Sequence, residues 1–319
     1  MLRIRLSYWP ILILILWGCR KDVEEFQPYS PTANEIGNLM SAQVPSPSTH
    51  TTFTFNYLTT DKVLETPAGV QIFLIDTDHL FSNANSGDPV FCSTCPDLKI
   101  EVTVVLDKGD IVARGLNTIG DGSMLFESGG MVRITASCNG QQLALLPDRT
   151  LKIQIPNSDP QSGFFVYNHI GSVSTNQQWA KSDQEVFEAE WPLPLGVQQE
   201  GYELLVKNLG WIACGRALAE PNSLFCIELP IGFADQNTLA YLVFKNQQIV
   251  APLQFDLGRN KFCYPKTPAG FQVQMVAVSK LGEQYWLGKA ETEIGTNATF
   301  QLGTQQITEQ AVLNFVKSL

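Results

Sequence analysis

The sequence predicts an all-β protein: two antiparallel β-sandwiches in tandem, followed by a short C-terminal helix. Beyond residue 51, apolar residues recur at every second position in most segments, which is the spacing of strands with one buried face. Helical spacing of apolar residues is confined to the end of the chain. Charged residues make up only 16% of the sequence, while Thr, Ser, Asn, Gln and Gly are abundant. Such a composition favours strands and turns over helices.

Residues 1–18 are predicted to lie outside the fold. Arg3 and Arg5 precede the apolar run Leu6–Leu16, and Leu16-Trp17-Gly18-Cys19 ends that run with a small residue and a cysteine. This order resembles a bacterial lipoprotein signal, in which cleavage after Gly18 leaves Cys19 to carry the lipid. We therefore predict a lipoprotein signal peptide over 1–18 and an anchor at Cys19.

The alternatives for this segment are an uncleaved transmembrane anchor and an ordinary secretory signal. A membrane-spanning helix needs about 20 apolar residues, whereas the apolar run before Cys19 is shorter and contains Pro10. An ordinary signal prefers small residues three positions before cleavage as well as directly before it, and Leu16 occupies the earlier position. Both observations favour the lipoprotein interpretation.

Residues 19–50 are predicted to be a flexible tether, because Pro28, Pro31, Pro45 and Pro47 lie among polar residues with little apolar periodicity. Strand spacing then predicts the N-terminal β-sandwich over 51–157. It is clearest in the stretches 100–106, 132–138 and 151–155.

Two turn signals support this first sandwich. Asn139-Gly140 is a strong hairpin signal, since both residues tolerate positive φ angles. Pro156 ends the last strand, because proline has no N–H to donate to a neighbouring strand.

Residues 158–200 are predicted to be a connector, since Pro160, Pro192 and Pro194 interrupt the strand pattern. Residues 201–319 form the predicted C-terminal Ig-like or transthyretin-like sandwich, with strands near 202–206, 224–229, 239–244, 249–255, 271–279, 285–288, 290–294 and 299–302. Thr308 is the predicted N-cap of the terminal helix. Its apolar face contains Val312, Phe315, Val316 and Leu319.

The charge balance excludes nucleic acid as a favoured partner. The chain carries 21 basic and 31 acidic residues, and removal of Arg3 and Arg5 with the signal peptide changes the formal net charge from −10 to −12. A polyanion without a basic stripe repels phosphate backbones.

Six cysteines remain besides Cys19, and an even number in an exported chain predicts disulfides. In the C-terminal half, any disulfide is expected to join Cys226 and Cys263, which lie at strand positions. Cys92 and Cys95 form a CxxC pattern in a polar loop, for which we expect either a small loop-closing disulfide or two free thiols. Redox and zinc sites are disfavoured, because no helix pattern follows Cys95 and the three histidines are not at ligand spacing.

The sequence contains no nucleophile elbow, HExxH motif, phosphate-binding loop or dinucleotide fingerprint. No catalytic residue, metal or cofactor is therefore predicted. Asp76-Thr77-Asp78-His79 contains oxygen ligands that suit calcium, but a solvated loop after the preceding strand is favoured, because Asp is a common turn residue. Glu185, Glu188 and Glu190 of the connector are the candidate acids for a glycosidase, and solvent-facing charges are the alternative.

Aromatic residues are the remaining candidates for a site. Trp179, Trp191, Trp211 and Trp286 are candidate binding aromatics, because exposed rings stack on sugars. The alternative is that they fill the cores of the sandwiches.

Several strand and turn motifs carry a resemblance to a known group. They are the run 122–131, the Asn139-Gly140 hairpin, the strand 151–156, the segment 209–214 and the paired segments 278–280 and 285–288. Together they resemble Bacteroidetes-type outer-membrane lipoproteins with a ZU5-like β-sandwich and an Ig- or transthyretin-like domain. That group tends to place an acid after the cysteine, where this chain has Gly215 and Arg216 after Cys214.

The resemblance implies a fold and a compartment but no reaction. The charges after Cys19, Arg20-Lys21-Asp22 with Glu24 and Glu25, resemble the signal that sends such lipoproteins to the cell surface. We therefore expect an outer-membrane protein, held by lipid on Cys19 and facing the cell surface. The expected function is non-enzymatic binding of a protein or glycan partner, and the alternative is a glycan-processing hydrolase that uses the connector acids.

Overall fold

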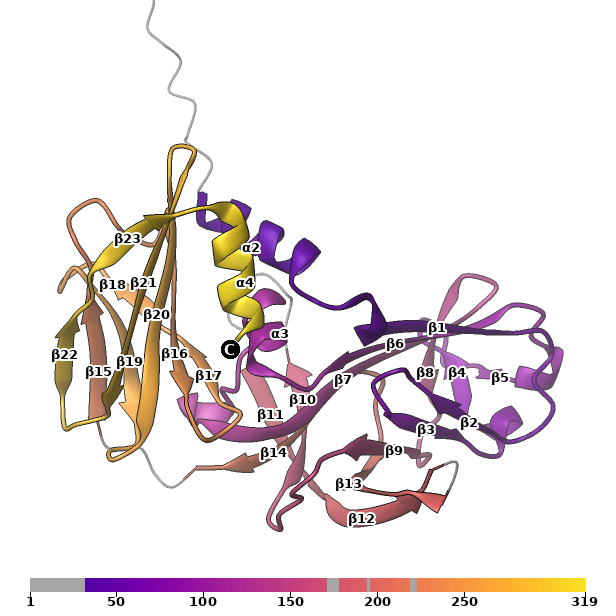
Figure 1. Ribbon diagram of the computed structural model, residues 1–319. Helices are drawn as coiled ribbons and strands as arrows, with labels where there is room; N and C mark the ends of the chain where they lie inside the picture. Colours follow the sequence, from indigo (N-terminus) through magenta and orange to yellow (C-terminus); the bar gives the residue numbers. More distant parts are fainter. Residues whose placement is uncertain (1–31, 171–177, 194–195, 219–222) are drawn as a thin grey trace, which may run out of the picture. The chain divides into compact units, whose positions relative to one another are not determined.

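The fold is all-β, with several antiparallel sheets and a short C-terminal helix, as the sequence predicts. The computed structural model describes residues 32–170, 178–193, 196–218 and 223–319 (Figure 1). The predicted signal peptide 1–18, Cys19 and the predicted tether up to residue 31 lie outside the described residues. Residues Thr32–Leu319 form one compact unit.

The N-terminal sandwich consists of two sheets that enclose one apolar core. Its larger sheet has nine strands: β1 (His50–Phe55), β4 (Phe81–Asn83), β5 (Pro89–Val90), β6 (Leu98–Val105), β7 (Phe126–Cys138), β8 (Gln141–Leu145), β10 (Phe165–Ile170), β11 (Gln178–Glu185) and β14 (Gly210–Ala217). The smaller sheet has five strands in the order β12 (Phe187–Pro192), β13 (Gln198–Val206), β9 (Leu151–Pro156), β3 (Gln71–Leu74) and β2 (Lys62–Glu65).

Alternating burial explains why these segments pair as strands. In β6, Leu98, Ile100, Val102 and Val104 are buried while the residues between them face outward. The predicted hairpin is confirmed: Asn139 and Gly140 both have positive φ angles and connect β7 to β8.

The C-terminal sandwich also has two sheets. One has the order β18 (Gln254–Asp256), β19 (Lys261–Thr267), β15 (Ser223–Glu228) and β22 (Ala298–Gln301), and β22 runs parallel to β15. The other has the order β17 (Val250–Pro252), β16 (Thr238–Phe244), β20 (Gln272–Leu281), β21 (Gln284–Glu293) and β23 (Thr304–Ile307).

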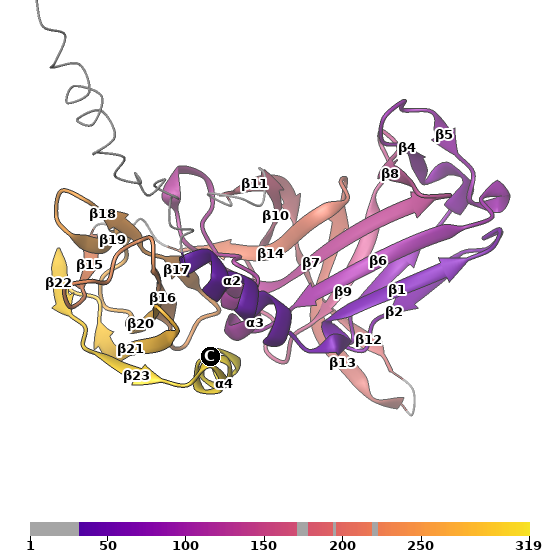
Figure 2. The same ribbon diagram turned by 90° about the horizontal axis from the view of Figure 1, so that it is seen from above.

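Three helices lie together where the two sandwiches meet: α2 (Thr32–Gln43), α3 (Lys108–Ala113) and α4 (Glu309–Lys317) (Figure 2). With neighbouring strands they form a junction core that includes Ile36, Met40, Met131, Trp179 and Val276. The predicted N-cap of α4 is confirmed, because the Thr308 hydroxyl accepts a hydrogen bond from the N–H of Ala311.

Helices α2 and α3 correct the expectation that only the end of the chain is helical. Residues 32–43, assigned to the flexible tether, instead form α2, in which Ile36 and Met40 are fully buried. Ile36, Leu39 and Met40 are spaced three and four residues apart, which is a helical face. The prolines on both sides of this short face obscured it in the sequence.

Residue 157, the predicted end of the first sandwich, does not separate the sheets: strands before it pair with strands after it. β7 pairs with β14, and β9 pairs with β13. The segment 158–200, assigned to a connector, supplies β10, β11 and β12. Among the described residues, no helix is long and apolar enough to cross a membrane.

Candidate functional site

The four candidate tryptophans do not form an exposed stacking surface. Trp179 is fully buried in the junction core, where its indole N–H donates to the carbonyl of Asn117 at 2.9 Å. Trp191 is also buried and lies so close to Gly201 that a Cβ atom at residue 201 would be 2.6 Å from the indole. Both side chains therefore act as core residues.

The other two tryptophans are half-buried on different strands. Trp211 of β14 packs against the junction core. Trp286 of β21 makes an edge contact with Phe233, with ring centroids 5.9 Å apart. The structure does not bring the four rings together into one site.

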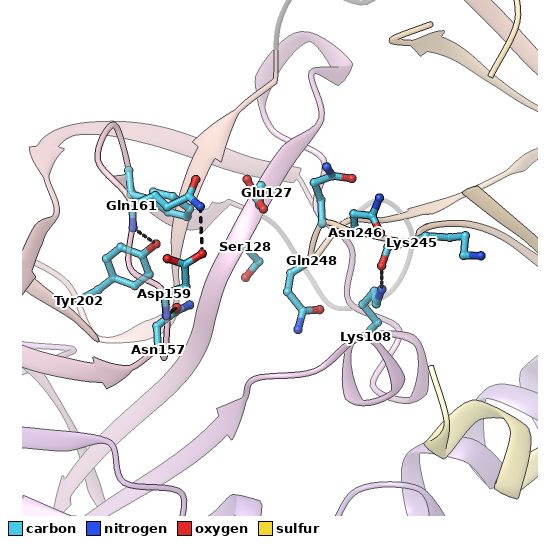
Figure 3. Close-up of a pocket in the computed structure, with 12 residues that line it drawn as sticks. Lys108, Glu127, Ser128, Asn157, Asp159, Gln161, Tyr202, Lys245, Asn246 and Gln248 are labelled. Carbon is cyan, nitrogen blue, oxygen red and sulfur yellow. Dashed lines mark hydrogen bonds between the residues drawn. The ribbon is translucent and has the colours of Figure 1, made fainter. Parts of the chain in front are cut away.

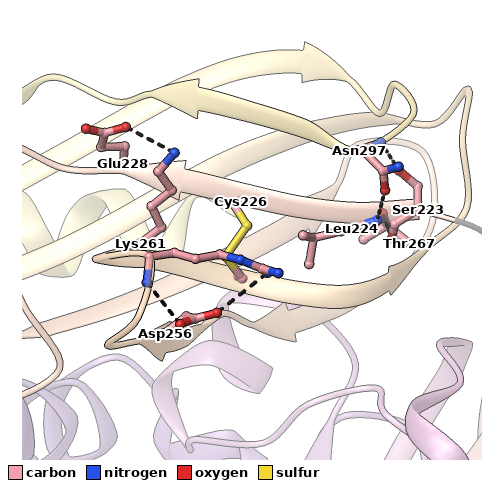
Figure 4. Close-up of a disulfide and its surroundings, with 10 residues drawn as sticks. Ser223, Leu224, Cys226, Glu228, Asp256, Lys261, Thr267 and Asn297 are labelled. Atoms are coloured by element: carbon pink, nitrogen blue, oxygen red, sulfur yellow. Dashed lines mark hydrogen bonds and ion pairs between the residues drawn. A yellow bond between two sulfur atoms is a disulfide. The ribbon is translucent and has the colours of Figure 1, made fainter.

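The cysteines of the described residues form two disulfides. Cys226 and Cys263 are joined, as the sequence favours, and they lie directly opposite each other on β15 and β19 (Figure 4). Neither alternative expected for Cys92 and Cys95, a disulfide between them or two free thiols, is correct: Cys95 is bonded to Cys138, and Cys92 is a buried free thiol. Register explains this outcome, because β6 begins just after Cys95 and its first residue, Leu98, pairs with Cys138.

Cys92 is a poor candidate for redox chemistry. Burial, together with the negative charge of Asp78, raises the pKa of its thiol to about 12. The thiolate, which is the nucleophile, is therefore scarce at neutral pH.

In the acidic cluster at 76–79, both carboxylates form hydrogen bonds or ion pairs with other residues of the protein. Asp76 contacts His79 at 2.8 Å and Arg149 at 3.2 Å, and the hydrogen bond to His79 is the main cause of its lowered pKa. Asp78 accepts a hydrogen bond from the N–H of Ser93 at 2.7 Å, which lowers its pKa. Within the described ranges, no group of three His, Cys, Asp or Glu side chains is arranged to hold a metal ion.

The connector acids lie on the outside of the N-terminal sandwich. Glu185 ends β11, while Glu188 and Glu190 belong to β12, the edge strand of the smaller sheet. All three side chains are exposed, and none lines either of the two pockets described for this chain.

A polar cleft of about 280 Å³ lies between the two sandwiches (Figure 3). Its lining comes from five separate segments of sequence and consists of Lys108, Glu127, Ser128, Asn157, Asp159, Gln161, Phe164, Tyr202, Lys245, Asn246, Gln247 and Gln248. Asn157, Asp159, Gln161 and Tyr202 stand on one side, and Lys108, Lys245, Asn246 and Gln248 on the other.

Backbone pairing fixes the loop 245–248 against the N-terminal sandwich. The N–H of Ser128 donates to the carbonyl of Gln248 at 3.0 Å. The Gln248 side-chain amide donates to the carbonyl of Leu106 at 3.1 Å. Lys108 donates to the carbonyls of Phe244 and Lys245, and burial lowers the pKa of its ammonium group. These contacts position the polar groups of the cleft without a bound ligand.

On the opposite side, the loop after β9 is ordered by the side chains of Asn157 and of Tyr202 in β13. The N–H of Asp159 donates to the Asn157 side-chain oxygen at 2.9 Å. The N–H of Gln161 donates to the Tyr202 hydroxyl at 2.9 Å, and burial raises the pKa of that hydroxyl to about 12. Tyr202 therefore stays neutral and retains its hydroxyl proton for donation.

Two of the four charged side chains that line the cleft, Glu127 and Lys245, form ion pairs, and Lys108 forms none among the described residues. Glu127 pairs with Arg216 at 2.6 Å, and Lys245 pairs with Glu291 at 2.6 Å. Asp159 takes part in no ion pair within the described part of the chain. The side-chain oxygen of Gln248 is buried and has no hydrogen-bond partner there. A buried acceptor without a donor is costly, and it belongs to a residue that lines the cleft.

Sequence reasoning missed this cleft. Its polar residues lie in ordinary turn segments, Asn157-Ser158-Asp159-Pro160-Gln161 and Asn246-Gln247-Gln248, which only the tertiary fold brings together. The clustering of amides in both turns was the available signal. No protein-family model matches the chain, and a search of curated proteins finds no match either.

Proposed function

We propose that this chain is a lipid-anchored cell-envelope protein that binds a glycan in the polar cleft without transforming it. The observation that carries the proposal is the lining of that cleft: amide side chains are its most numerous group, five of the twelve residues, and the buried Gln248 oxygen lacks a donor. Amides both donate and accept hydrogen bonds, and sugar hydroxyls do the same, so the two are chemically matched. Lys108 and Asp159, the two charged lining residues without an ion pair among the described residues, have opposite signs, so the lining does not favour a ligand of either charge.

The envelope location rests on the sequence and on the cysteines. The signal ending at Cys19 and the motif resemblance to Bacteroidetes-type outer-membrane lipoproteins support an anchor in the outer membrane, facing the cell surface. The disulfides Cys95–Cys138 and Cys226–Cys263 agree with export, because disulfides persist in oxidising compartments.

Binding is tested by titrating the protein with a panel of neutral and acidic oligosaccharides in a calorimeter. We expect a neutral oligosaccharide to bind, and Gln248→Ala and Asp159→Ala each to weaken that binding by about tenfold, the value of roughly one hydrogen bond. Asp183→Ala is the matched control, since Asp183 is exposed on β11 outside the cleft. Exclusive binding of acidic sugars, or no binding to any sugar, would contradict the proposed ligand class.

The same mixtures test the hydrolase alternative. Sugar products that accumulate with the wild-type protein but not with Glu188→Gln or Glu190→Gln would contradict the non-enzymatic proposal. We expect the oligosaccharides to be recovered unchanged.

Anchoring is tested with Cys19→Ser in a bacterial host. The wild-type protein should partition into detergent and carry lipid by mass spectrometry, whereas the variant should remain an unprocessed precursor. Identical processing and partitioning of the two proteins would overturn the anchor.

A further inference from the structure

The two most exposed large apolar side chains of the described residues both lie on turns of the C-terminal sandwich. Ile231 is 102% exposed in the turn between β15 and β16, and Leu257 is 81% exposed in the turn between β18 and β19. Single exposed apolar residues are ordinary on protein surfaces. These two are informative because they lie at one end of the sandwich, the end at which the described chain begins.

Both turns lie at the same end of the sandwich. Ile231 follows the end of β15 at Glu228, and Leu257 precedes the start of β19 at Lys261. Glu228 and Lys261 form an ion pair at 3.4 Å, with Asp256 at the same end of the strands (Figure 4). The opposite end carries Ser223, Thr267 and Asn297.

The described chain also begins at this end. The N–H of Ala33 donates to the carbonyl of Gln236, in the same turn as Ile231, at 3.0 Å. The Thr32 hydroxyl donates to the carbonyl of Lys280 at 3.0 Å. About 13 residues separate Cys19 from Thr32, and an extended chain of that length reaches at most about 45 Å. A lipid on Cys19 therefore keeps this end of the sandwich within that distance of the membrane.

Charges at this end are largely neutralised by one another. Lys280 pairs with Glu35 at 2.6 Å, and Arg259 pairs with Asp256 at 3.5 Å, in addition to the Glu228–Lys261 pair. Asp235 and Glu283 are the remaining acids near these turns. These residues leave a small net negative charge, so contact with a lipid surface is governed by apolar side chains and not by attraction to anionic lipid.

We infer that the turns containing Ile231 and Leu257 contact the phospholipid surface when Cys19 is anchored there. This inference rests on the proposed anchor. One lipid chain gives only marginal, reversible membrane binding, and inserted apolar side chains add to it. The contact would also orient the C-terminal sandwich toward the membrane.

The test attaches a single myristoyl-length chain to the Cys19 thiol through a maleimide, using the chain from Cys19 onward, which contains the whole compact unit Thr32–Leu319. Cys19→Ser, which couples no lipid at this position, gives the baseline. Partition is measured by sedimentation with phosphatidylcholine vesicles. Because the lipid is coupled chemically, this result is independent of whether cells lipidate Cys19.

We expect Ile231→Asp with Leu257→Asp to lower the partition coefficient by about tenfold or more. The matched control is Val63→Asp with Ile75→Asp, two apolar residues of the N-terminal sandwich that are 51% and 54% exposed. The control should retain its partition, and the difference between the two double variants should persist at high salt.

Three outcomes would overturn the inference. The first is equal partition of the Ile231/Leu257 double variant and the parent protein, and the second is an equal loss in the control. The third is a change in oligomeric state of the lipid-free variant, which would assign the turns to contacts between copies of the chain. Thermal unfolding of each variant verifies that the fold is intact.

Discussion

The N-terminal and C-terminal sandwiches each contain one disulfide. One bond joins two paired strands, and the other joins a strand to an irregular loop. Cys226 and Cys263 already lie opposite each other in paired strands. Cys95 lies in the segment 91–97, which contains a short 3₁₀ helix, η4 (Cys92–Thr94), and no strand. One bond reinforces an existing ladder, whereas the other attaches an irregular loop to β7. The comparison teaches that similar loop lengths, with sequence separations of 43 and 37 residues, do not imply similar local roles.

The largest effect is expected from Cys95→Ala with Cys138→Ala. Loss of the cross-link should lower the free energy of unfolding by about 4 kcal/mol through loop-closure entropy, as measured by urea denaturation. The loop should also loosen, so that the buried Cys92 thiol reacts with a thiol reagent under native conditions.

Cys226→Ala with Cys263→Ala is the matched control for this prediction. It should lower the free energy of unfolding by a similar amount, because the enclosed segment is of similar length. Amides of β15 should nevertheless stay protected from hydrogen exchange, since β19 and β22 still flank that strand. Equal increases in hydrogen exchange around the two deleted disulfides would contradict this comparison.

A smaller effect is expected at the place where the sandwiches meet. Asp110 of α3 is buried there, and desolvation, reinforced by Asp107 and opposed by Arg114, raises its pKa to about 6. The folded state therefore binds a proton more tightly than the unfolded state, whose carboxyl has an ordinary pKa near 3.8. The contribution of Asp110 to the free energy of unfolding is therefore fully present below pH 4 and is lost as the pH rises through 6.

Asp110→Asn should remove this pH dependence. Between pH 4 and pH 7, the wild-type protein should lose about 1–3 kcal/mol of unfolding free energy that the variant does not lose. Urea denaturation at both pH values measures the difference, with Asp183→Asn as the exposed control. An equal change with pH in wild type and Asp110→Asn would show that the junction does not hold Asp110 in a raised-pKa environment.

The smallest effect concerns α4, which packs on α3, α2 and β21 in the junction core and contains no cysteine. Thr308→Ala removes the N-cap hydrogen bond to Ala311 and should cost about 1 kcal/mol. Hydrogen exchange should increase in α4 before any other element responds, because a helix of nine residues depends on its cap and its packing. Thr308→Ser retains the hydroxyl and should behave like wild type.

The features that the sequence predicted are those encoded by neighbouring residues. Alternation in β6, the Asn139-Gly140 turn and the Thr308 cap each depend on a few consecutive positions. The junction core and the cleft depend on residues far apart in sequence, such as Ser128 and Gln248, whose contact requires both sandwiches to be in place. Helix α2 was missed for a related reason, since its apolar face is short and is stabilised by packing on β16 and β20.

The position of β14 has a consequence for the order in which the protein is made. This strand lies between β10 and β7, and Gly210 pairs with Ile134. A growing chain that has reached residue 157 therefore has most strands of the N-terminal sandwich but leaves the edge of β7 open. Open edges pair readily with other chains, so the first half exposes an aggregation-prone edge until residue 217 has been synthesised. If the chain is exported unfolded, as the proposed location implies, β14 is already present when folding begins.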